Sequence, residues 1–258
     1  MLGKVKGVAR NIILSSFGPF SPVKAGTFFL NGHFVTKENL PLEHQASLFE
    51  KQLKELSKEF DFVSPGEALA NMTQKAYKLL CFTFDDGFSD NLSVIAPVAE
   101  RFNTKCLFFV NPDFIGLPDE KAGKVLQENY LVDFTKFFLT KEQVIELSRR
   151  GHTIGSHTSS HMRMTIDDQS VINDQLIRSK TDIEAIIKQE CNTFAHPFGG
   201  MNHLSEKALQ TALETYTFVF ASTVSNKSFE ADRKVINRRH FEGNWPVSHI
   251  KYFLSRRT

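Results

Sequence analysis

Residues 79–91, Leu-Leu-Cys-Phe-Thr-Phe-Asp-Asp-Gly-Phe-Ser-Asp-Asn, decide the fold. Residues 79–84 form a short apolar run that is typical of a buried strand, and the loop after it contains Gly87. Residues 91–102 have the pattern of a helix, and residues 105–110 (KCLFFV) predict a second strand. A strand, a helix and a strand in this order form a crossover that joins parallel strands. The segment therefore predicts a parallel α/β architecture.

The same alternation extends along the chain on both sides of this segment. Strands are expected at 27–36, 152–156, 192–195, 218–221 and 235–237, and helices at 43–60, 140–150, 168–189 and 204–214. Ser64 with Glu67, and Thr140 with Gln143, have the spacing of a helix capping box. Residues 111–139, which contain several prolines and glycines, are expected to form a long loop. Repeated strand–helix units predict an α/β fold with a parallel barrel or sheet, in which functional residues gather at the carboxyl ends of the strands.

Length and composition exclude several classes of protein. The 258 residues, 41% of them hydrophobic, suit one large domain, so we expect residues 1–258 to form a single catalytic domain. A formal net charge of +2 gives no sign of nucleic-acid binding. No apolar stretch approaches 18 residues, which predicts no membrane span and, without a signal-peptide core, a cytoplasmic protein. The basic residues at positions 4–10 allow weak contact with a membrane surface.

Two pairs of polar residues follow the ends of expected strands. Asp85 and Asp86 are adjacent, which is common in plain turns, but it also lets one carboxylate bind a metal while the other acts as a base. His157 and His161 are four residues apart, so in a helical turn both rings reach one ion. Two surface histidines also fall at this spacing by chance. Both pairs in one α/β chain favour a divalent metal with open coordination positions and a hydrolytic reaction.

The chain resembles the polysaccharide deacetylase family, carbohydrate esterase family 4. TFDDG at 83–87 and HTSSH at 157–161 are similar to the first two family motifs, and TFAHPFG at 193–199 is similar to the third. FDDGFSDN (84–91), KCLFFVN (105–111) and LTKEQVIELSRRGHTIGSHTSSH (139–161) also resemble family segments in the family order, so the resemblance covers residues 28–240. It implies a distorted (β/α) barrel of about seven parallel strands. It also implies metal-dependent removal of an acetyl group from an N-acetylated sugar.

The resemblance also assigns residues to roles. Asp85 matches the catalytic base, and Asp86, His157 and His161 match the metal ligands, usually of zinc. Pro197, Phe198 and Gly199 match the motif that shapes the substrate groove, where the backbone N–H near Phe198 would hold the carbonyl oxygen.

Two departures from the family pattern leave roles open. Many members have an arginine two residues before the motif proline, bonded to the base, whereas this chain has Ala195. Arg238 or Arg239 could orient Asp85 instead, and Arg238 is also a candidate contact for the substrate. The late family motif that supplies the general acid has no clean copy here. Some members have a permuted arrangement in which a strand before the first motif ends in a histidine, so His33 is the first candidate, ahead of His240 and His196.

The leading hypothesis is a zinc-dependent deacetylase of an N-acetylated sugar in a glycan, or in a precursor of a surface polysaccharide. The altered third motif leaves open hydrolysis of another non-peptide C–N bond, in a formamide or a cyclic ureide. A glycan-binding module that has lost catalysis is the third hypothesis.

Overall fold

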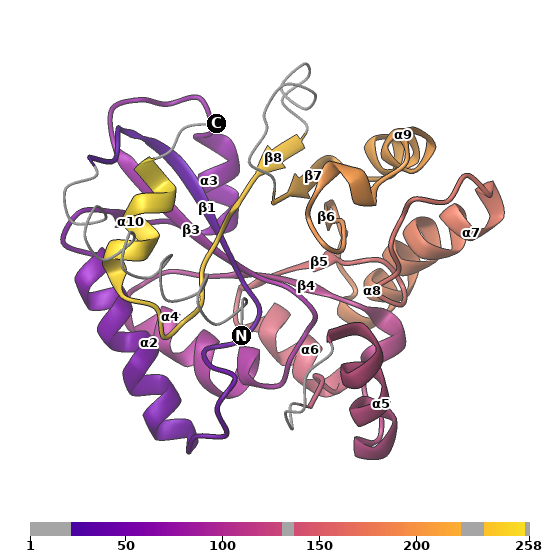
Figure 1. The fold of residues 1–258 in the computed structure, drawn as a ribbon, viewed down its shortest axis with the longest axis horizontal. Helices are drawn as coiled ribbons and strands as arrows, with labels where there is room; N and C mark the ends of the chain where they lie inside the picture. The colour runs from indigo at the N-terminus through magenta and orange to yellow at the C-terminus, as the bar shows by residue number, and fades with distance from the viewer. Residues whose placement is uncertain (1–21, 131–136, 223–234, 256–258) are drawn as a thin grey trace, which may run out of the picture.

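The computed structural model describes residues 22–130, 137–222 and 235–255. Its centre is one sheet of parallel strands, as the sequence predicts (Figure 1). The strands are β1 (Gly26–Gly32), β3 (Lys78–Phe84), β4 (Leu107–Val110), β5 (Thr153–Ser156), β6 (Thr193–Ala195), β7 (Phe218–Ala221), β8 (Val235–Asn237) and β9 (Arg239–His240). They follow the order β8-β7-β6-β5-β4-β3-β1-β9, and the short β2 (Asp61–Phe62) pairs with β3.

One segment, residues 235–240, joins the two edges of this sheet, and we call it the crossing segment. Its first half, β8, pairs with β7, where Val219 lies opposite Val235. Its second half, β9, pairs with β1, where Leu30 lies opposite Arg239. The crossing segment therefore runs from one edge strand to the other and nearly closes a barrel, and Figure 1 shows it extending from β8 along β1. With β8 and β9 taken as one strand, the barrel has about seven strands, as the family resemblance implied.

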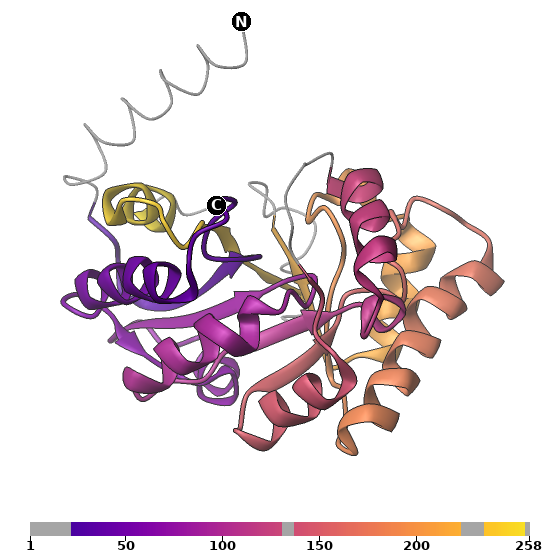
Figure 2. The same ribbon diagram turned by 90° about the horizontal axis from the view of Figure 1, so that it is seen from below.

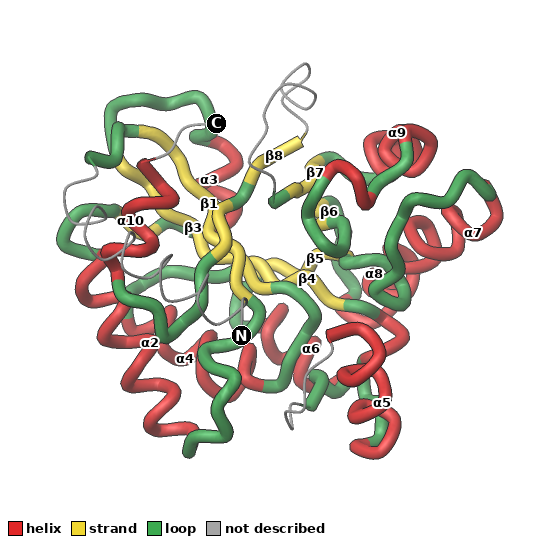
Figure 3. Tube along the Cα trace, in the orientation of Figure 1, coloured by secondary structure: helices red, strands yellow, loops and turns green. Residues whose placement is uncertain are grey.

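Helices cover the outside of the barrel (Figure 3). They are α2 (Leu42–Leu56), α3 (Pro65–Ala70), α4 (Ala96–Arg101), α5 (Asp119–Tyr130), α6 (Lys141–Arg149), α7 (Gln169–Asn173), α8 (Ser179–Ile187), α9 (Glu206–Thr215) and α10 (Val247–Ser255). The π-helical turns η2 (Asn91–Ile95) and η4 (Asp174–Arg178) continue into α4 and α8, and η3 (Pro112–Phe114) and η5 (Met201–His203) are 3-10 turns. Both expected capping boxes are present, at Ser64 and at Thr140. Among the described residues, no helix has the length and apolar character needed to cross a bilayer.

Successive side chains of the strands point to two different cores. Cys81 belongs to a cluster inside the barrel, with Phe109 and Phe220, whereas Phe82 belongs to the larger core between the barrel and its helices. The barrel interior is tight at β5, because a Cβ on Gly155 would lie 2.6 Å from both Phe109 Cδ1 and Thr193 Oγ1. The three cysteines are buried free thiols.

Two segments differ from the expectation. Residues 111–139 are not one long loop, because η3 and α5 lie within them; Pro112 and Pro118 begin helical turns here instead of breaking structure. The helix α10 was not predicted, and it packs beside α2, a neighbour almost 200 positions earlier (Figure 2). Residues 4–10, whose basic character allows weak contact with a membrane surface, lie outside the described residues.

Candidate active site

The predicted site residues meet at the carboxyl ends of neighbouring strands. Asp85 and Asp86 follow β3, His157 follows β5, and Pro197 follows β6. His33 follows β1, the strand that pairs with β3. Because parallel strands end at the same edge of the sheet, residues more than a hundred positions apart share one site.

Asp86, His157 and His161 form the candidate metal site. Each of them offers one ligand atom, and these atoms lie within 4.8 Å of one another. The Nε2 atoms of both histidines lie 3.4 Å from Oδ1 of Asp86, and all three side chains are buried. Nδ1 of His157 lies 2.7 Å from the carbonyl oxygen of Ala195, so it donates its proton there and Nε2 keeps a lone pair. Two imidazoles and a carboxylate at this spacing fit a first-row divalent ion such as zinc.

The two histidines converge through a loop, not through the helical turn that their spacing suggested. Thr158 and His161 both have left-handed backbones, with φ of 64° and 57°. The buried amide of Asn111, at the end of β4, donates to the carbonyl oxygen of His157 and, at 3.1 Å, to that of Thr158. This side chain supports the loop from inside the barrel. In the sequence, the only indication that Asn111 could have such a role is its position directly after a strand.

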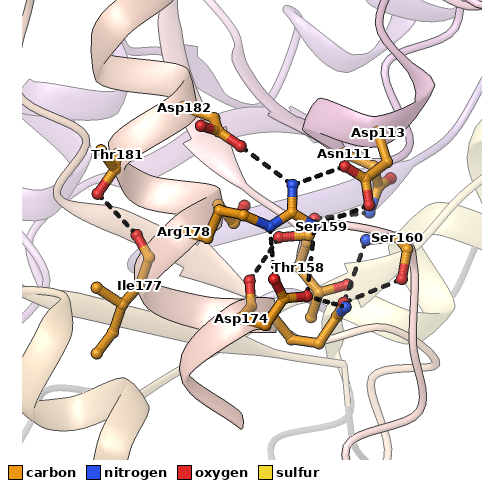
Figure 4. Close-up of polar contacts among 12 residues, drawn as sticks. Asn111, Asp113, Thr158, Ser159, Ser160, Asp174, Ile177, Arg178, Thr181 and Asp182 are labelled. Atoms are coloured by element: carbon orange, nitrogen blue, oxygen red, sulfur yellow. Dashed lines mark hydrogen bonds and ion pairs between the residues drawn. The ribbon is translucent and has the colours of Figure 1, made fainter. Parts of the chain in front are cut away.

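The π-helical turn η4 holds the same loop from the outside (Figure 4). The backbone N–H of Ser159 donates to the carbonyl of Gln175, and the N–H of Ser160 donates to its side-chain oxygen, both at 3.1 Å. A π turn widens the helix by one residue and aims these acceptors at the loop.

Arg178, the last residue of η4, ties this turn to the 3-10 turn after β4 (Figure 4). Its guanidinium donates to both oxygens of Asp113, at 2.8 and 3.0 Å, and to Asp174 at 2.7 Å. Its remaining acidic partner is Asp182, at 3.1 Å. The turn that supports the histidine loop is therefore itself held in place by ion pairs.

Two sharp turns shape the site, and each has two successive left-handed residues. Asp86 and Gly87 have φ of 75° and 70°, and Phe198 and Gly199 have φ of 65° and 64°. At Gly199 a Cβ would lie 2.6 Å from Cβ of Ser222, so glycine is required there. Within the described residues no acceptor takes the backbone N–H of Phe198, which leaves this donor for a ligand.

Arg238 lies beside Asp85, as expected for one of the two arginines proposed to orient it. Its terminal nitrogens donate to both carboxylate oxygens, at 2.6 and 2.8 Å. The guanidinium also donates to Thr83 Oγ1 and lies over the ring of Phe109. Because its side chain is fully buried, Arg238 offers no surface to a substrate, which is the other role considered for it. Burial alone would raise the pKa of Asp85, but Arg238 and His157 hold it well below its usual range.

The three candidates for the general acid have different surroundings. Nε2 of His33 lies 3.9 Å from Oδ2 of Asp86, and the ring is one-third exposed. Its pKa is lowered, mainly because most of the ring is removed from solvent. His196 is buried, with Nδ1 3.2 Å from the Pro197 carbonyl. His240 is more exposed and packs against the rings of His33 and Trp245. Of the three, His33 is the one whose ring approaches the candidate metal site.

Comparisons with known proteins identify the family and the fold. A family model described as polysaccharide deacetylase matches residues 72–216, which is more than half of the chain. The Bacillus subtilis strain 168 protein YxkH, provisionally named a polysaccharide deacetylase, is 26% identical over 154 residues. That alignment covers 58% of this chain and 49% of YxkH, so the chain matches about half the length of this relative.

Solved structures share the fold. The Streptococcus pyogenes deacetylase PplD, in complex with acetate, has a TM-score of 0.64 at 22% identity, covering 90% of this chain and 99% of PplD. IcaB from Ammonifex degensii has a TM-score of 0.65 at 20% identity, covering 90% and 97% of the two chains. A de-N-acetylase from Aggregatibacter actinomycetemcomitans has a TM-score of 0.62 at 20% identity, covering 89% and 99%.

Proposed function

Because the chain belongs to the polysaccharide deacetylase family, we propose that it removes the acetyl group from an N-acetylated sugar at a divalent metal, zinc being the expected ion. The observation that carries this proposal is the geometry around Asp86. Three buried side chains that can bind a metal, one carboxylate and two imidazoles, lie together there, and the neighbouring carboxylate is paired with a buried arginine. A glycan, or a precursor of a surface glycan, is the proposed substrate.

Each residue of the site has a task in this reaction. A divalent ion held by Asp86, His157 and His161 would polarise the acetyl carbonyl and lower the pKa of water. Asp85, kept ionised by Arg238, accepts a proton from the attacking water. The unused N–H of Phe198 donates to the carbonyl oxygen as negative charge develops on it. His33, whose ring is the candidate acid nearest to Asp86, would take up the proton that Asp85 accepts from water and pass it to the leaving nitrogen, because its lowered pKa leaves the ring neutral at pH 7.

The test separates metal binding from catalysis. Asp85→Asn should keep one metal ion per chain, measured by elemental analysis, and lose about 10²–10⁴-fold in acetate release from an N-acetylglucosamine oligomer. His157→Ala should lose the metal itself. Asp61→Asn is the matched control, because this exposed aspartate lies beside the start of β3, at the opposite end of the barrel. Full activity of Asp85→Asn, or of the chelated protein, would refute the mechanism, and release of formate or ammonia in place of acetate would identify a different C–N hydrolase.

A further inference from the structure

Beside the candidate metal site lies an exposed cation that the proposed chemistry does not use. Arg163 follows His161 by two residues, and its guanidinium carbon lies 4.3 Å from the ring centroid of Phe198. The Phe198 ring in turn lies 5.0 Å from the ring of His161 and is 42% exposed. Arg163 is therefore separated from a proposed metal ligand by one aromatic ring.

A histidine from another loop completes this group. Nη1 of Arg163 lies 2.5 Å from Nδ1 of His203, and the His203 ring packs edge-on against Phe198 at 5.5 Å. Because a guanidinium can only donate, Nδ1 of His203 accepts, and its proton must sit on Nε2. We call Arg163, Phe198 and His203 the rim cluster. It has several N–H donors and a positive charge.

The backbone fixes the position of the rim cluster. The N–H of Met164 donates to the carbonyl of His203 at 3.0 Å, and the N–H of Ser205 donates to the carbonyl of Met164 at 2.7 Å. Met164 and Leu204 form an isolated parallel bridge. The loop after β5 and the loop after β6 are thus joined at the residues that directly follow Arg163 and His203.

The charge of Arg163 is not balanced by any carboxylate in the part of the chain that the structure describes. Arg101, Arg150 and Arg178 each form an ion pair with a carboxylate. In contrast, no aspartate or glutamate of the described residues forms an ion pair with Arg163. Among the described residues, the partners of the Arg163 guanidinium are a neutral imidazole and an aromatic face, so it still has donors for an oxyanion.

We propose that the rim cluster is an anion-binding subsite, and that the natural substrate is an N-acetylated sugar with a phosphate or a carboxylate near the acetyl group. This inference rests on the proposed deacetylase function and adds the chemical class of its substrate. The exposed part of the Phe198 side chain contacts the sugar, and Arg163 with the Nε2–H of His203 binds the oxyanion. A phosphate of a carrier and a carboxylate of an acidic sugar share this chemistry, so the test includes both.

Three matched probes test the proposal: the trimer of N-acetylglucosamine, its 1-phosphate, and the trimer with a terminal uronic acid. We expect kcat/KM for at least one anionic probe to exceed that for the neutral trimer by about fivefold, the size of a partly exposed ion pair. Arg163→Gln should abolish this preference, and Arg163→Lys should retain part of it. Raising the salt concentration should weaken the preference in the wild type.

The controls keep failure of this inference distinct from failure of the proposed function. Arg149→Gln makes the same change at an exposed arginine that precedes β5, away from the site, and should leave the preference unchanged. Binding of the same probes to Asp85→Asn, measured by calorimetry, does not depend on turnover. Acetate release without preference for an anion overturns the subsite alone. If no probe is deacetylated, the proposed function fails, and equal or undetectable binding of the three probes then overturns the subsite as well.

Discussion

Replacing Arg238 by glutamine should destabilise the protein more than any surface substitution. The guanidinium is fully buried and donates to both oxygens of Asp85, whose side chain is 4% exposed. Glutamine keeps a polar amide but removes the charge, so the carboxylate of Asp85 stays buried without a cation.

The expected loss is about 3–5 kcal/mol in the free energy of unfolding, the cost of removing one partner of a buried ion pair. Such a loss is a large part of the roughly 5–15 kcal/mol that stabilises a typical domain. For a chain of this size it lowers the melting temperature by roughly 6–20 °C.

The assay is urea unfolding at neutral pH in the presence of a chelator, so that metal binding does not contribute. Asp85→Asn, Arg238→Gln and the double variant form a thermodynamic cycle. We expect the double variant to be more stable than Arg238→Gln alone, because a neutral amide in place of the Asp85 carboxylate leaves no buried charge unpaired. Arg101→Gln is the control, since its ion pair with Glu50 is half exposed and contributes at most about 1 kcal/mol. If the two single changes add to within about 0.5 kcal/mol, Asp85 and Arg238 are not coupled and the reasoning is wrong.

Three further predictions concern other parts of the barrel. His152 is buried, accepts the Cys106 N–H at 3.0 Å, and has its pKa lowered by burial to about 4. The folded pKa of His152 lies below its unfolded value, so the stability that the neutral ring provides is complete above about pH 6.5 and is lost as the pH falls towards 4. The wild type should therefore be less stable at pH 5 than at pH 7, and His152→Gln should reduce this difference in unfolding free energy by about 2 kcal/mol. Asn111→Ala should weaken zinc binding by about 10–100-fold in a competition titration, since the histidine loop loses its inner support, and unchanged affinity would contradict that role. Gly155→Ala should lower the free energy of unfolding in urea by about 1–3 kcal/mol, because its Cβ would enter occupied space. Gly66→Ala is the control and should not destabilise the protein, since a Cβ there has no atom within 4 Å. Equal effects of the two changes would contradict the tight barrel interior.

The strands and the cluster of polar residues were predictable because both are local in the sequence. The run at 79–84 identifies a buried strand, and a polar residue directly after such a strand must lie at its carboxyl end. Arg238 became a candidate partner of Asp85 because the arginine that many family members place before the motif proline is absent here, so a buried carboxylate needs another cation. That reasoning could name two candidates, and packing in three dimensions put Arg238 beside Asp85.

Features that depend on contacts between distant segments were not predictable. The spacing of His157 and His161 suggested a helical turn, but left-handed residues and the amide of Asn111 set the loop. The π-helical turn η4 supports this loop from the outside, but the sequence predicted one regular helix over the segment that contains it. A π turn produces no clear change in the spacing of hydrophobic residues. The rim cluster joins Arg163 to a residue 40 positions away, through backbone contacts that have no sequence pattern.

The crossing segment also affects the order in which the contacts of the site can form as the chain is synthesised and folds. Asp86, His157 and His161 are all present once residue 161 has been synthesised, but the cation for Asp85 comes 153 positions after it. Contacts of such high contact order form late, because the entropy of closing a long loop must be overcome first. The same six residues close the barrel and bring Arg238 to Asp85. A chain folded only as far as residue 161 would therefore have Asp85 and the three proposed metal ligands before the buried cation that pairs with Asp85 is in place. On the proposed mechanism, activity would appear only after the crossing segment has docked.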